Sequence, residues 1–91
     1  MNRQNIDELT NLLRKIRLRK KLTVRALAKQ LYCSYTSISL YENGLQKPKL
    51  SFVDKLERYT IDTEFYNKKA LNAIRSKIIE LRKSDKVSKK T

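Results

Sequence analysis

The most informative absence in this chain of 91 residues is histidine, which does not occur at all. The commonest transition-metal ligand and the usual acid–base catalyst at neutral pH are therefore both missing. The sequence also has no glycine-rich phosphate loop and no cluster of carboxylates outside scattered helix faces. We therefore expect no enzymatic activity, no metal site, no cofactor and no small-molecule ligand.

Glycine, proline and cysteine each occur only once, as Gly44, Pro48 and Cys33. So few helix-breaking residues predict an all-α fold with long helices and few tight turns. A single cysteine cannot form an internal disulfide, which is typical of a reducing compartment. Apolar runs are too short to cross a membrane, and polar residues interrupt the first apolar cluster, where a signal peptide would be hydrophobic. We expect one small cytoplasmic domain without a membrane partner.

Acidic residues are missing from a long stretch of the chain. No Asp or Glu lies between Leu9 and Tyr41, whereas eight lysines and arginines do. The whole chain carries a net charge of +13, from 22 Lys and Arg against 9 Asp and Glu. Solubility explains mixed charge well but charge of one sign poorly, so this composition favours a polyanionic partner such as nucleic acid.

Hydrophobic spacing predicts helices at about 7–20, 24–31, 35–42, 52–59 and 64–83. Thr23, Ser34 and Ser51 are expected to cap the second, third and fourth of these, because a hydroxyl can accept a free backbone N–H. We predict a main domain over 1–61, a C-terminal helix over 62–83 and a disordered basic tail over 84–91.

The segment 22–44 reads as two short helices joined by a tight turn, with Cys33 at a core position. It resembles the helix-turn-helix of the lambda-repressor-like family, the phage Cro and repressor proteins and their bacterial relatives, over about 12–60. The matching residues are Arg17, Leu27, Ala28, Leu31, Ile38, Glu42, Asn43, Gly44 and Pro48. One position departs: the family usually has glycine where this chain has Tyr32, at a left-handed site that costs other residues ~1 kcal/mol.

The resemblance implies double-stranded DNA as the partner, with the second helix of the motif entering the major groove. The positions that would touch base edges are Tyr35, Thr36, Ser39 and Leu40. None is Arg, Gln or Asn, so strong bidentate base contacts are absent and DNA shape gains weight. For Tyr35 and Leu40, ordinary surface or partial core is the alternative interpretation.

The resemblance also implies phosphate contacts and one ion pair. Donors would come from the start of the first motif helix, at Thr23 and Val24, and from Asn43, Lys47 and Lys49 after the second. The family often has Gln at the position of Val24, so one side-chain contact is missing. Matching residues of the family form a structural ion pair, which Arg17 and Glu42 would make here.

An apolar row in the last predicted helix needs a surface to cover it. Leu71, Ile74, Ile78 and Leu81 are spaced 3, 4 and 3 residues apart, as in a packing seam. Two outlets are open: packing onto the same domain, or a symmetric partner. We favour the partner and predict a homodimer through these residues.

These observations favour a sequence-specific transcriptional repressor from a phage, plasmid or other mobile element, bound to the nucleoid. It would act by steric occlusion of a near-palindromic operator. Two alternatives stay open: an antitoxin or inhibitor that binds protein, and a weakly specific architectural or recombination accessory DNA binder.

Overall fold

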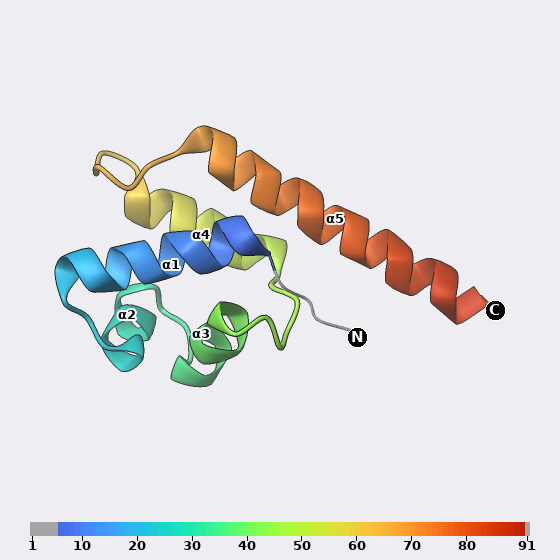
Figure 1. Cartoon of the computed structure of the whole chain (residues 1–91), viewed down its shortest axis with the longest axis horizontal. Helices are drawn as coiled ribbons and strands as arrows, with labels where there is room; N and C mark the ends of the chain where they lie inside the picture. The colour runs from blue at the N-terminus through green and yellow to red at the C-terminus, as the bar shows by residue number, and fades with distance from the viewer. Residues whose placement is uncertain (1–5, 91) are drawn as a thin grey trace.

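A computed structural model of the chain describes residues 6–90, with side chains described for 6–83. Helix α5 lies against α1 and α4, on the side of α1 that faces away from α2 and α3 (Figure 1). Helices α2 and α3 contact each other, and α3 also contacts α1. The all-α fold is therefore confirmed, with helices α1 Asp7–Lys20, α2 Val24–Gln30, α3 Tyr35–Glu42, α4 Leu50–Thr60 and α5 Lys68–Lys90.

The two helices of the motif begin where hydroxyl caps were predicted. Thr23 Oγ1 accepts the N–H of Ala26 at 3.1 Å, and Ser34 Oγ accepts the N–H of Ser37 at 3.1 Å. The cap predicted at Ser51 is wrong, because α4 begins at Leu50 and its N-cap residue Lys49 makes no side-chain cap bond. The reason lies in the backbone: Lys49 is extended, with φ −90° and ψ 150°, and its carbonyl already accepts the first helical N–H groups.

Helix α5 starts later and ends later than the 64–83 predicted from hydrophobic spacing. A turn at 61–67 delays its start to Lys68, where Asn67 Oδ1 accepts the N–H of Ala70 at 3.0 Å and caps the helix. Helix α5 then continues to Lys90, beyond the predicted end at 83. The prediction that 84–91 is disordered stays a prediction, because residue 91 and the side chains of 84–90 lie outside the described residues.

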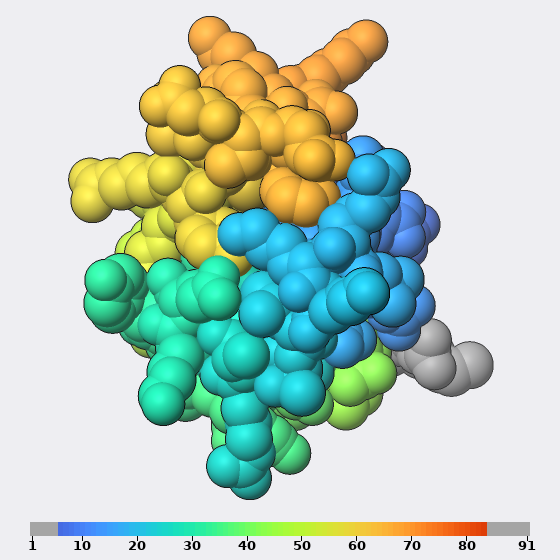
Figure 2. All heavy atoms as spheres, turned by 90° about the vertical axis from the view of Figure 1, so that its left-hand side faces the viewer, coloured from blue at the N-terminus to red at the C-terminus, as the bar shows by residue number. Residues whose placement is uncertain are grey.

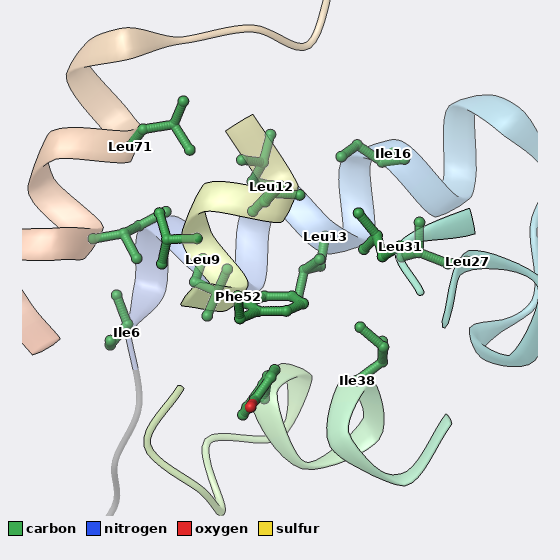
Figure 3. Packing of buried hydrophobic residues seen from close by; sticks show 14 of the residues in the cluster. Ile6, Leu9, Leu12, Leu13, Ile16, Leu27, Leu31, Ile38, Phe52 and Leu71 are labelled. Atoms are coloured by element: carbon green, nitrogen blue, oxygen red, sulfur yellow. The ribbon is translucent and has the colours of Figure 1, made fainter. Parts of the chain in front are cut away.

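The hydrophobic core centres on Phe52 of α4. Its ring lies among side chains of α1 and α3, such as Leu9, Leu13 and Ile38, which are at most 1 % exposed (Figure 3). The ring of Tyr41 approaches it with centroids 4.7 Å apart. Each fully buried side chain of this kind stabilises the fold by roughly 1.5–3 kcal/mol.

The apolar row of α5 belongs to this same core. Leu71, Ile74 and Ile78 are 0 % exposed, and Leu81 is half-buried against the core. The prediction that this row forms a dimer seam is therefore wrong, because the apolar faces of α1 and α4 take it up within one chain. Of the two surfaces that could cover this row, the one observed is that of the same domain.

The turn between α2 and α3 contains the predicted left-handed residue. Tyr32 has φ 54°, its side chain is 85 % exposed, and its carbonyl accepts a bond from Lys55 Nζ at 2.9 Å. Gly44, with φ 66°, ends α3 in the same way. Cys33 differs from its prediction, since it is half-buried at the edge of the core.

Candidate nucleic-acid interface

Helix α3, the second helix of the motif, is fixed to α1 by the predicted ion pair. Arg17 Nε donates to Glu42 Oε2 at 2.9 Å, and Arg17 Nη2 donates to Glu42 Oε1 at 3.1 Å. Glu42 is only 6 % exposed and Arg17 25 %. Such a bidentate pair fixes both the distance and the relative orientation of the two side chains, and so of α1 and the end of α3. It also neutralises the one carboxylate of the motif, which would otherwise repel phosphate.

The outward face of α3 carries the predicted base-reading residues. Tyr35 and Thr36, in its first turn, are exposed, while Ser39 and Leu40, in the next turn, are half-buried. The opposite face is fixed in the core by Ile38, as 3.6-residue periodicity requires. The structure therefore brings these four side chains together on one surface, with the first two most accessible.

The predicted phosphate contacts lie at the two ends of the motif. At the start of α2, Thr23 is exposed but its hydroxyl is used as a cap, and Val24 is half-buried against the core. After α3, Asn43 donates its Nδ2–H to the carbonyl of Ser39 at 2.8 Å, which occupies part of its amide.

Two lysines in the loop before α4 complete this set. Lys47 is half-buried and Lys49 is exposed, on either side of the buried Pro48. Both lysines lie in the loop that joins the end of α3 to the start of α4. Lys49 is the more accessible of the two for a phosphate group.

Sequence reasoning missed one contact at this surface. The guanidinium of Arg25, in α2, lies over the ring of Tyr35, with Cζ 4.7 Å from the ring centroid. Both residues border an open hollow of about 450 Å³ between α2 and α3, which Ala26 and Ala28 also line. The absence of acidic residues around Arg25 in the sequence was one signal for a functional role, but nothing in the sequence indicated that Tyr35 lies beside it across the turn.

Part of the basic stretch of the chain points elsewhere. At the end of α1, Arg19 pairs with Glu64 of the loop before α5 at 3.1 Å. Lys20 donates to the hydroxyl of Tyr59 in α4 at 2.9 Å and lies over its ring. Figure 2 shows this end of the molecule, where α1 (blue) meets the loop before α5 (orange). These cations therefore tie α1 to its neighbours rather than extend the surface of α3.

Cys33 belongs to the turn between α2 and α3 and borders the hollow described above. Burial raises the pKa of its thiol above its usual range, while the charge of Lys55 lowers it to a smaller extent. Burial likewise raises the pKa of the Tyr41 hydroxyl. Both groups are neutral at physiological pH, so neither subtracts from the positive charge of the surface.

Neither a metal centre nor a membrane span is found in the described residues. Within 6–83, His, Cys, Asp and Glu side chains form no group of three that could hold a metal ion. None of the five helices of the described chain is both long and apolar enough to span a bilayer.

Comparison with known proteins gives one match. A protein-family model described as helix-turn-helix matches residues 13–60, just over half of the chain. No curated protein and no solved structure matches significantly. The matched segment begins within α1 and ends with α4, so it contains both helices of the motif and the loop that carries Lys47 and Lys49.

Proposed function

Because the chain belongs to the lambda-repressor-like helix-turn-helix family of DNA-binding regulators, we propose that it is a sequence-specific transcriptional repressor. The observation that carries this proposal is the outward face of α3, where Tyr35 and Thr36 are exposed while Glu42 anchors the helix end to α1. A rigid helix with an exposed first turn is what the major groove accepts.

Repression by steric occlusion fits the arrangement of the described residues. The described residues form one body around a single core, and they offer α3 as the surface for an operator. We place the protein in the cytoplasm on the nucleoid, encoded by a phage, plasmid or other mobile element, where small basic regulators of this kind are common. The charge of +13 would give it a high encounter rate with DNA.

The first test is the salt dependence of DNA binding, measured by fluorescence anisotropy. A protein with six to ten phosphate contacts loses about 10³–10⁵ in affinity between 50 and 200 mM salt. A steep loss is expected here. A flat response would favour the protein-binding alternative, an antitoxin or inhibitor, and equal affinity for operator and random DNA would favour an architectural role.

The second test separates base reading from phosphate binding. Thr36→Ala and Ser39→Ala should change which sequences are preferred, whereas Lys47→Ala and Lys49→Ala should weaken binding to all sequences about equally. The readout is competition between operator and random duplexes for each variant. Identical behaviour of the two pairs would contradict the assignment of the reading face to α3.

We also propose that the repressor binds its operator as a homodimer. Base-reading side chains that are hydroxyls or aliphatic groups discriminate only weakly between bases. In a dimer, binding of one subunit raises the effective concentration of the other at a second half-site about one helical turn away, without new contacts. With the inner row of α5 buried, Ile79, which is 43 % exposed, is the candidate contact on that helix. Sedimentation should show that Ile79→Asp gives a folded monomer, while Ile61→Asp, in the exposed turn before α5, stays dimeric.

A further inference from the structure

We infer that Arg25 is a specificity-determining residue, held on the ring of Tyr35 so that its guanidinium reads a guanine in the major groove. The inference rests on the proposed function and adds a base reader that lies outside α3. It assigns Tyr35 a second role, as the platform for that reader.

The contact between Arg25 and Tyr35 joins the two helices of the motif at the protein surface. Arg25 is the second residue of α2 and Tyr35 the first of α3, and both side chains are exposed. With Cζ 4.7 Å from the ring centroid, the geometry is that of a cation–π contact. Because α3 enters the groove with its N-terminus first, this contact lies at the leading end of the reading helix.

The hydrogen-bonding capacity of Arg25 is unused. Among the described residues Arg25 makes no hydrogen bond or ion pair, whereas Arg17 and Arg75 are each bonded to carboxylates. Five N–H donors are therefore available on this guanidinium. The neighbouring sequence offers no carboxylate to compete for them, since it has none between Leu9 and Tyr41.

The contact with Tyr35 is made to the ring and uses no hydrogen-bond acceptor, so it pairs none of the N–H donors of the guanidinium in a hydrogen bond. These donors lie in the plane of the guanidinium and form a fork along its edge. Guanine O6 and N7 accept two parallel bonds from such an edge, the commonest specific contact in DNA recognition. The adjoining hollow is open to solvent, and Ala26 and Ala28 line part of it with small side chains.

The other base readers make this assignment distinctive. Thr36 and Ser39 carry hydroxyls that can bond to several bases, and Leu40 can only pack on a methyl group. Arg25 can thus make a bidentate contact, which Thr36, Ser39 and Leu40 cannot. A phosphate oxygen is the competing partner for a guanidinium, and the test separates the two.

The test selects bound sequences from a random pool of duplex DNA with the full chain, as wild type, Arg25→Ala, Arg25→Lys and Tyr35→Leu. Wild type should enrich a guanine at one fixed position of each half-site. Arg25→Ala should lower that preference roughly tenfold to a hundredfold and leave the other positions intact. Arg25→Lys should restore it only in part, because an ammonium lacks the fork, and Tyr35→Leu should weaken the same position.

Arg58→Ala is the matched control, since it removes the same charge from an exposed site on α4. It should leave the selected sequence unchanged, and circular dichroism of all variants verifies the fold. If Arg25→Ala lowers affinity equally for every sequence, or leaves the consensus unaltered, the inference is overturned while the proposed function stands. If wild type enriches no sequence, the proposed function fails and the inference with it.

Discussion

Removing the carboxylate of Glu42 tests how the recognition helix is held in place. Glu42→Ala leaves the guanidinium of Arg17 without the two carboxylate oxygens that accept its hydrogen bonds, in a site where Arg17 is only 25 % exposed. Breaking a buried ion pair from one side typically costs about 3–5 kcal/mol. Because Arg17 regains some hydration from its exposed quarter, we place the loss near the lower end, at about 3 kcal/mol.

Thermal unfolding followed by circular dichroism is the assay. For a domain of this size 1 kcal/mol shifts Tm by about 4–8 °C, so Glu42→Ala should lower Tm by roughly 12–24 °C. Glu64→Ala is the internal control, because its pair with Arg19 is 64 % and 63 % exposed and should contribute little. A double-mutant cycle of Arg17→Ala and Glu42→Ala that gives coupling below about 0.5 kcal/mol would refute the argument.

Three further predictions concern the core and the turn between α2 and α3. Ile78→Ala should lower the free energy of unfolding in urea by about 2–5 kcal/mol, because this side chain is 0 % exposed; a change typical of a surface site would contradict its placement. Tyr32→Gly should raise that free energy by ~1 kcal/mol, because glycine has no Cβ to oppose φ 54°; urea titration measures the gain. For Cys33, the raised pKa of the thiol disfavours the thiolate in the folded state, so alkylation by iodoacetamide at alkaline pH should be slower in folded than in denatured protein. Ionisation of Cys33 should therefore not affect the free energy of unfolding at neutral pH. That free energy should fall as the pH rises past the pKa of the thiol in the unfolded state.

The motif was largely predictable from sequence because its determinants are local. Thr23 and Ser34 cap the N–H groups three residues ahead of them, and the apolar spacing fixes which face of α3 turns inward. Tyr32 occupies the left-handed site expected from its place in the motif. The Arg17–Glu42 pair is long-range, and it was predicted through the family resemblance rather than from spacing.

What the sequence did not determine depends on which surfaces meet. The spacing of Leu71, Ile74 and Ile78 indicates a seam, but a seam against α1 and α4 has the same period as one against a second chain. The contact of Arg25 with Tyr35 likewise crosses a turn whose backbone path decides which side chains become neighbours. Neither arrangement produces a pattern in the sequence that distinguishes it from the alternatives.

The packing of α5 also has a consequence for how the chain emerges from the ribosome. When residues up to 60 have left the ribosome, the whole segment that carries the helix-turn-helix motif is outside, yet the apolar surface that Leu71, Ile74 and Ile78 later cover is still open. A nascent chain at that stage exposes hydrophobic surface on α1 and α4, which is the kind of surface that chaperones bind. The DNA-binding domain can therefore complete its core only after α5, which contributes none of the proposed DNA contacts, has also left the ribosome.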